Sequence, residues 1–293
     1  MSLTAPADVR TRLARALFTR VAGPDAEAQR DRIHLSPGPR WFAPGAPICR
    51  VHGDASMFIG GIRALLLQSM HPQAMAAVAA HSGFRSDPWG RIARTSHFLA
   101  VTTFGTAADA ATAVRRVGAA HEVVHGVTTD GTPYHASDPH LLRWVHVAEI
   151  DSFLRAHQHY GDCPLDAAGR DGYVADTAAV AQRLGVVDPP RTERELHEQL
   201  DAYRPELRAT AEARDAVRFV LWTPPLPFAA RPAYGVLAAA AVAMMPRWSR
   251  WPLRLPYLPV AEATVVRAAG AVATRTIRWA LSADSPSPGL TRS

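Results

Sequence analysis

The chain has 293 residues, of which 48% are hydrophobic and 20% charged, so it can bury the core of one large domain. All 32 basic residues are arginine, and the formal net charge is +6. The arginines are scattered among acidic residues and do not cluster with aromatic side chains, which argues against nucleic-acid binding. The two cysteines, Cys49 and Cys163, are too few for a disulfide scaffold or a cysteine-rich zinc site.

The sequence gives no targeting or membrane signal. The first residues lack the apolar run of a signal peptide. The longest uncharged apolar stretch, Pro232–Pro246, is too short to span a bilayer. We therefore expect a cytoplasmic protein without a membrane span, which leaves peripheral membrane contact open.

The N-terminal part predicts a surface helix, a loop and an interior helix. Residues 8–22 form a short amphipathic pattern, and the proline- and glycine-rich stretch 35–53 predicts a loop. Asp54 is expected to cap a helix over 55–70 that is apolar almost all round. Gly60 and Gly61 in its middle cost about 1 kcal/mol each relative to alanine. That cost indicates close approach by another backbone or by a flat ligand.

Two further helices are predicted next. His71-Pro72 ends the interior helix, and residues 73–81 form a short one. Asp87 followed by Pro88 predicts the start of the second, because Asp is a good N-cap and Pro fits the first helical position. This second helix covers 89–104. Its i, i+3, i+4 spacing places three polar side chains on one face, namely Arg91, Arg94 and Thr95.

A helix from Thr106 to Gly126 organises the rest of the chain. Thr106 and Asp109 form a capping-box-like start, and Gly126 is a natural stop because glycine adopts the left-handed cap readily. His121 and His125 are four residues apart and are therefore expected on one helical face. Burying two imidazoles beside an apolar stripe costs free energy unless they have polar partners. We therefore expect a functional site at these histidines.

The remaining sequence predicts one hairpin followed by helices. Asp130-Gly131 marks the hairpin turn, and Asp138-Pro139 opens a helix that runs to about Tyr160. Later helices are predicted over 165–184, 193–204, 206–222, 233–245 and 260–281. The Ser- and Pro-rich tail over 282–293 is expected to be disordered. The prediction is thus a single all-α domain over 1–281 with at most one small hairpin.

One interpretation of the histidine pair is a zinc site. His121-Glu122-x-x-His125 matches the helical motif in which two histidines bind zinc and the glutamate activates water. Glu149 on another helix could supply a third ligand. Against a zinc hydrolase, Gly126 stops the helix at once, and the strands that flank such sites are missing.

A second interpretation takes in more of the chain. The stretches GDASMFIGGIRALLLQSMHP, RIART, HEVVHG and DGTPYHASDPHLLRWVH, at 53–72, 91–95, 121–126 and 130–146, occur in a specific order and spacing. In this the chain resembles the family of rubber oxygenases (latex-clearing proteins) and the oxygenase MpaB, with the resemblance covering about 45–225. It implies an all-helical bundle with globin-like packing around a haem pocket. It also implies haem b with a histidine axial ligand, and O₂-dependent oxidation of an apolar or lipid-like small molecule.

The resemblance assigns roles residue by residue. His121 is the implied axial ligand of the haem iron, and His125 takes the place of a family arginine, where it can pair with a propionate. Arg91 and Arg94 are candidate propionate partners. In rubber oxygenases the position of Arg94 holds a lysine of the distal side, which also includes an upstream glutamate that we match to no residue here. The haem fold can therefore transfer while the rubber substrate does not.

Other residues complete the predicted site. Arg94, Thr95 and His146 form the predicted catalytic set, with His146 on an inward-facing turn. The glycines Gly60 and Gly61 would let a helix lie near the macrocycle, and His71 is included because family members also have His-Pro there. We expect four other histidines on the surface, namely His135, His157, His159 and His197.

Several bland alternatives stay open. His121 could be a hydrogen-bonded interface histidine, Arg91 could bridge to Asp87, and the glycines could serve only close helix packing. A non-catalytic haem or lipid carrier of the same fold is the main functional alternative, and a zinc hydrolase is the third.

Overall fold

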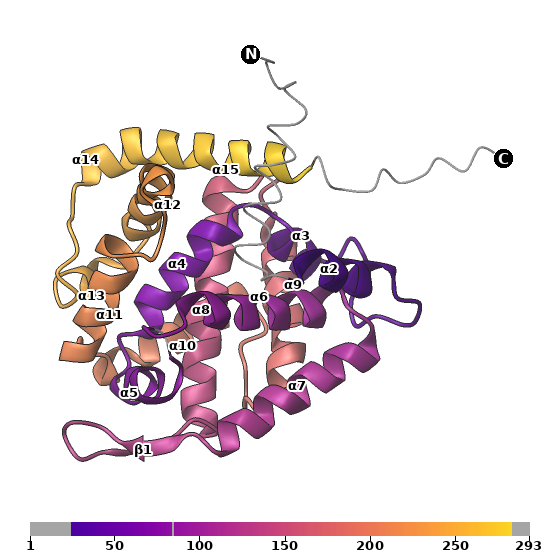
Figure 1. Cartoon of the computed structure of the whole chain (residues 1–293), viewed down its shortest axis with the longest axis horizontal. Coiled ribbons are helices and arrows are strands. Elements are labelled where there is room, and N and C mark those ends of the chain that lie inside the picture. Colours follow the sequence, from indigo (N-terminus) through magenta and orange to yellow (C-terminus); the bar gives the residue numbers. More distant parts are fainter. Residues whose placement is uncertain (1–24, 84, 283–293) are drawn as a thin grey trace.

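The computed structural model describes residues 25–83 and 85–282, and helices dominate it (Figure 1). The helix predicted over 8–22 and the tail after Ser282 lie outside the described residues. The expectation of a mostly all-α chain with one small hairpin is confirmed for the described part.

The core forms around two antiparallel helices, α4 (Met57–Gln68) and α8 (Pro139–Tyr160), with α8 running through the middle of the molecule (Figure 1). The start of α8 is as predicted, since the Asp138 side chain accepts a hydrogen bond from the His140 backbone N–H at 2.8 Å. The start of α4 differs. Asp54 does not cap the helix, because its carboxylate accepts the Ser56 N–H and forms an ion pair with Arg278.

A buried ion pair joins the two core helices. Arg63 of α4 and Asp151 of α8 lie 2.7 Å apart, and their side chains are 0% and 1% exposed. The Arg63 guanidinium also donates to the Ser152 hydroxyl and to the Met244 carbonyl, at 2.6 and 3.0 Å. Burial alone would raise the pKa of Asp151, but the charges of Arg63 and Arg155 hold it below its ordinary value.

The other helices surround this pair. The region 35–53, predicted as a loop, contains a short buried helix, α3 (Pro47–His52), whose Ile48, Cys49 and Val51 are buried. Proline at its first position is compatible with a helix start, so the prolines that indicated a loop do not exclude it. The remaining helices are α2 (Ala26–Leu35), α5 (Pro72–His81), α9 (Ala167–Arg183), α10 (Glu193–Ala202), α11 (Ala211–Trp222), α12 (Arg231–Ala243), α13 (Arg247–Arg250), α14 (Pro259–Ala261) and α15 (Arg267–Leu281). Short 3-10 turns cover Arg204–Glu206 (η1) and Phe228–Ala230 (η2), and a π-helical turn (η3) covers Glu262–Val266.

Two helices, α6 (Pro88–Phe104) and α7 (Ala107–Glu122), pack against each other near their connection and diverge towards strand β1 (Figure 1). Both starts are as predicted. Asp87 accepts from the Gly90 N–H at 2.9 Å, and Thr106 accepts from the Asp109 N–H at 3.2 Å.

The end of α7 corrects a prediction. The helix stops at Glu122 rather than near Gly126, and the chain continues into β1 (His125–Val127), which pairs with β2 (Pro133–His135). Gly126 faces Tyr134 across this hairpin, and a Cβ added to Gly126 would lie 2.6 Å from the Tyr134 hydroxyl oxygen. The glycine therefore serves strand packing and not a helix cap.

Among the described residues, no helix combines the length and apolar character that crossing a bilayer requires.

Candidate functional site

The α6–α7 pair is far less buried than the central helix α8. More than half of the 22 residues of α8 are buried. In α6 only Val101, Thr102 and Thr103 are buried, and in α7 only Ala110 and Val114. Most of the polar residues predicted for the site lie on or beside this pair.

His121 lies in the last turn of α7 and is partly buried. Its Nδ1 is buried without a hydrogen-bond partner among the described residues. Desolvation lowers the pKa of this imidazole from its ordinary value, so the ring is neutral at pH 7. A neutral imidazole with an unpartnered buried nitrogen is able to ligate a metal ion.

His125 does not share a helical face with His121, which corrects the second expectation for this region. It is exposed on β1, opposite His135 of β2, and the two ring centroids are 5.4 Å apart. Because α7 ends at Glu122, the i, i+4 geometry of a helical His-Glu-x-x-His zinc motif is absent. Glu122 itself is exposed.

The hairpin fastens the end of α7 to the beginning of α8. The Ala136 N–H donates to the Val124 carbonyl at 2.8 Å, and α8 begins at Pro139. His121 lies one turn before this junction, and His146 lies two turns after it on α8. The hairpin thus joins the two helix ends that carry these histidines.

His146 and Glu149 are three residues apart and share a face of α8. Desolvation lowers the pKa of His146 to about 4 and raises the pKa of Glu149 to about 7. Both side chains nevertheless keep some accessible surface, and His146 Nε2 has no hydrogen-bond partner among the described residues.

A third enclosed histidine, His52 at the end of α3, was not predicted. Its Nδ1 lies 2.8 Å from the Thr103 hydroxyl of α6 and its Nε2 lies 3.3 Å from the Tyr173 hydroxyl of α9. Desolvation lowers the pKa of His52 to about 3, so the ring is neutral. The pKa of Tyr173 is raised by burial and by the nearby Glu149, which places this hydrogen-bonded chain beside the α8 carboxyl. No sequence signal marked His52, because it lies in a stretch predicted as a loop.

The three residues predicted from the RIART stretch have different surroundings. The Arg91 guanidinium donates to the Ser82 hydroxyl at 2.8 Å, and desolvation lowers its pKa. Arg94 is exposed and forms an ion pair with Asp87 at 3.1 Å, so the bridge to Asp87 that was the alternative role of Arg91 is made by Arg94 instead. Thr95 is also exposed. The catalytic roles of Arg94 and Thr95 stay predictions.

The two glycines of α4 differ from each other. A Cβ added to Gly60 would lie 2.9 Å from Phe153 Cδ1 and 3.2 Å from Ala156 Cβ, both on α8. Gly60 therefore permits close packing of α4 on α8, and the flat ligand expected against it is replaced by a helix. A Cβ added to Gly61 would meet nothing within 4 Å.

His71 belongs to a different group of side chains from His121. It is 2% exposed at the beginning of α5, and its ring lies near His140 of α8 and Glu206 of η1. Nine residues separate His140 from Glu149 on α8, which at 3.6 residues per turn places them on opposite faces of that helix. The haem contact expected of His71 therefore stays a prediction, and its surroundings are those of a second cluster.

Of the histidines expected on the surface, His157 is 2% exposed, which contradicts that expectation. It lies in the last turn of α8 within the packed core, where its backbone carbonyl accepts the Gly161 N–H.

Several groups with shifted pKa values lie on or beside α6, α7 and α8. They are three neutral imidazoles (His52, His121 and His146), a guanidinium (Arg91) and a carboxyl whose pKa is raised to about 7 (Glu149). Individually, groups of these kinds can ligate a metal, pair with a carboxylate group and exchange a proton at pH 7.

Comparison with known proteins supplies the family context. The family described as ER-bound oxygenase mpaB/B′/rubber oxygenase, catalytic domain, matches residues 49–279. Uncharacterized proteins of Mycobacterium bovis and Mycobacterium tuberculosis are each 35% identical to this chain over 99 residues. That stretch is 33% of this chain and 36% of each relative, so the match spans about a third of the relatives' length. No solved structure matches the chain.

Proposed function

Since the chain belongs to the mpaB/rubber oxygenase catalytic-domain family, we propose that it is a haem b-dependent oxygenase that acts on an apolar small molecule or lipid-like substrate with O₂. The observation that carries this proposal is His121: a neutral imidazole at the end of the partly exposed helix α7, whose buried Nδ1 has no hydrogen-bond partner among the described residues.

Three of the side chains that the resemblance assigns to the site suit a haem. A neutral ring nitrogen of His121 would ligate the iron. Arg91 is desolvated and has only a neutral hydroxyl partner at its Nη1, so it would gain a charge-assisted hydrogen bond from a propionate. His125 is exposed on β1, three residues beyond the end of α7, and is our candidate for a second propionate contact. When bound, haem would supply the redox-active iron that O₂ chemistry requires.

The chain's own groups would handle protons. The Glu149 carboxyl is able both to donate and to accept a proton at neutral pH, because desolvation brings its pKa to about 7. His146, on the same face of α8, is neutral and has an unpartnered Nε2 that can accept a hydrogen bond from Glu149, water or substrate. We propose that these two residues form the proton-handling side of the site, and that His52 and Tyr173 hold it in place.

The experiment compares haem content in matched variants. Wild type expressed with adequate haem should purify red, with about one haem per chain and a strong Soret band. His121→Gly should be colourless but folded by circular dichroism, and added imidazole should restore the Soret band. His125→Ala should keep the haem, with weaker retention or an altered potential. A colourless His125→Ala beside a red His121→Gly would overturn the ligand assignment, and a colourless wild type would overturn the haem proposal.

Glu122→Gln separates this proposal from the zinc hydrolase. With Glu122 exposed and His125 on a strand, the substitution should leave haem content unchanged. Loss of a metal-dependent peptidase activity in this variant would instead support the zinc interpretation.

A non-catalytic haem or lipid carrier of the same fold is a second candidate, favoured by the exposed Arg94–Asp87 ion pair where rubber oxygenases have a distal lysine. O₂ uptake by the haem-loaded protein with an unsaturated hydrocarbon probe distinguishes the two. The oxygenase consumes O₂ in proportion to substrate oxidised, whereas a carrier binds the probe without O₂ uptake.

A further inference from the structure

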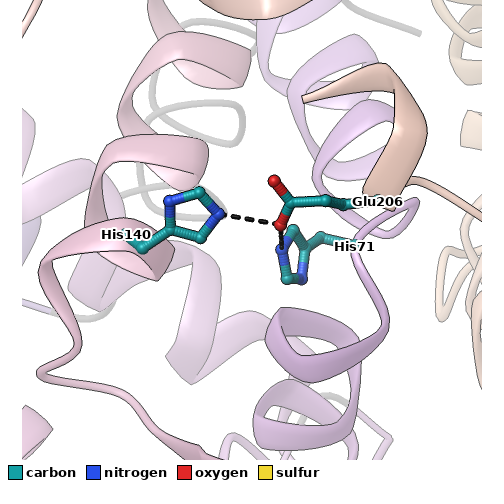
Figure 2. A group of neighbouring side chains, drawn as sticks. All are labelled: His71, His140 and Glu206. Carbon is teal, nitrogen blue, oxygen red and sulfur yellow. Dashed lines mark hydrogen bonds and ion pairs between the residues drawn. The ribbon is translucent and has the colours of Figure 1, made fainter. Parts of the chain in front are cut away.

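A second cluster of ligand-type side chains lies on the face of α8 opposite Glu149. His71 at the beginning of α5, His140 in the first turn of α8 and Glu206 at the end of η1 come from three separate segments (Figure 2). One ligand atom from each residue can be chosen so that all three lie within 4.8 Å of one another. Among the described residues, this is the one group of three or more histidine, cysteine or acidic side chains with such spacing.

The contacts within the cluster converge on one carboxylate oxygen. Glu206 Oε2 lies 2.8 Å from His140 Nε2 and 3.6 Å from His71 Nε2 (Figure 2). The shorter distance is a hydrogen bond, but the longer one is not, and within the described part of the chain both buried ring nitrogens of His71 have no hydrogen-bond partner. An imidazole that is 2% exposed and unpartnered at both nitrogens is costly, and it points towards the other two ligands.

The surroundings hold the three segments together. The backbone N–H of Arg208 donates to the Met70 carbonyl at 2.9 Å, which holds the chain after η1 against the residue before His71. The Tyr203 hydroxyl donates to the His140 carbonyl at 2.8 Å and lies 3.4 Å from His140 Nδ1, so it is placed to orient that ring. Trp144 and Tyr203 line the cluster with aromatic surface, their ring centroids 6.0 and 6.4 Å from that of His71.

From this geometry we infer that His71, His140 and Glu206 form a binding site for a divalent first-row metal ion, separate from the haem region. Two histidines and one glutamate are a ligand set known for zinc, with a position left for water. Ligand atoms around a tetrahedral zinc ion lie roughly 3.3 Å apart, as follows from bond lengths of about 2.0–2.2 Å. On zinc binding, the distance between Glu206 Oε2 and His140 Nε2 must therefore increase slightly, and the distance between Glu206 Oε2 and His71 Nε2 must decrease.

Charge and exposure agree with a cation site that solvent can reach. His140 and Glu206 are 41% and 44% exposed, whereas His71 is buried, so an ion could enter from the side of the first two residues. Of the arginines near the cluster, Arg208 is engaged by Asp130, and Arg143 donates to the Tyr203 hydroxyl at 3.2 Å. Glu206 forms no ion pair with an arginine among the described residues, so its charge is available to a metal.

The test is zinc titration of the full-length, haem-loaded protein after treatment with a chelator. Calorimetry should show one Zn²⁺ per chain. His140→Ala and Glu206→Gln are both at exposed positions that need not disturb folding. Each should weaken zinc binding by more than about 100-fold, which exceeds the loss typical of residues that only support the ligands. His135→Gln is the matched control, because His125 and His135 form an exposed histidine pair that could capture zinc by itself. It should leave the affinity within about 2-fold of wild type.

The inference is overturned if zinc does not bind, if both ligand variants bind it like wild type, or if His135→Gln abolishes binding. Haem content keeps this test separate from the proposed function. His140→Ala and Glu206→Gln should retain the wild-type Soret band, and His121→Gly should lose it while zinc affinity stays unchanged. Joint loss of both ligands in any of these variants would contradict two independent sites.

Discussion

Helices α4 and α8 pack against each other, and so do α6 and α7, but the two pairs differ in how much of their side-chain surface is buried. In α4–α8, Gly60 lets the backbones approach, and a buried ion pair and large apolar side chains fill the contact. In α7 the apolar side chains are only alanine and valine, and few residues of either α6 or α7 are buried. The first pair thus serves as a buried scaffold, and the second lies nearer the surface, where we propose that the haem binds.

The largest expected effect breaks the scaffold. Asp151→Asn leaves Arg63 buried without its charge partner and should cost about 3–5 kcal/mol of stability. Urea denaturation measures this loss. The control is Glu198→Gln, which removes an equally short but exposed ion pair with Arg194. It should cost less than about 1 kcal/mol. Equal losses in the two variants would contradict the special role of the α4–α8 contact.

The next effect concerns Glu149, which faces away from the scaffold's ion pair. Its pKa of about 7 in the folded protein lies above the ordinary value of 4.5, so its contribution to stability is complete below pH 4.5 and is lost as pH rises through 7. In Glu149→Gln no carboxyl group can ionise, so this loss of stability at higher pH does not occur. The variant should therefore gain stability over wild type at pH 8, by about 3 kcal/mol at most, and should show no gain at pH 4.

Denaturation of wild type and Glu149→Gln at both pH values tests the sign. The exposed Glu122 supplies the control, since Glu122→Gln should show no pH-dependent difference from wild type. A gain by Glu149→Gln that is the same at pH 4 and pH 8 would exclude desolvation of the carboxylate as its cause.

The smallest effects compare adjacent glycines. Gly60→Ala forces a Cβ against Phe153 and Ala156 and should cost about 1–3 kcal/mol. Gly61→Ala meets nothing within 4 Å, so it should stabilise α4 by about 0.5–1 kcal/mol through helix propensity. Melting temperatures of the two variants should shift in opposite directions. A shift in the same direction would contradict the close packing of α4 on α8 at Gly60.

Local sequence signals predicted three helix starts, because capping depends on a few neighbouring residues. Asp87, Thr106 and Asp138 each accept the backbone hydrogen bond that their sequence context indicates, whereas Asp54 does not cap α4. The end of α7 was not predictable in this way. Gly126 has the composition of a helix stop, but Tyr134 across the hairpin determines its conformation, and that contact spans eight residues of turn and strand.

The sequence likewise predicted only the part of the candidate site that local motifs mark. His121 and His146 stood out through motif and helical spacing, whereas His52 acquires its role only from Thr103 and Tyr173, which are distant in sequence. The cluster of His71, His140 and Glu206 likewise joins three segments that no spacing rule connects. Tertiary packing decides such groupings, and a single sequence does not carry that information.

Hydrogen exchange with and without haem tests most directly whether the α6–α7 pair, and not the scaffold, holds the cofactor. On haem binding, the amides of α7 around His121 and those of α6 around Arg91 should exchange more slowly, because the bound haem would restrict local opening of these helix ends. Amides of α4 and of the buried part of α8 should change little, and His121→Gly should show none of the α7 protection. Protection confined to the α4–α8 pair, or an unchanged α6–α7 pair in haem-saturated protein, would contradict this assignment.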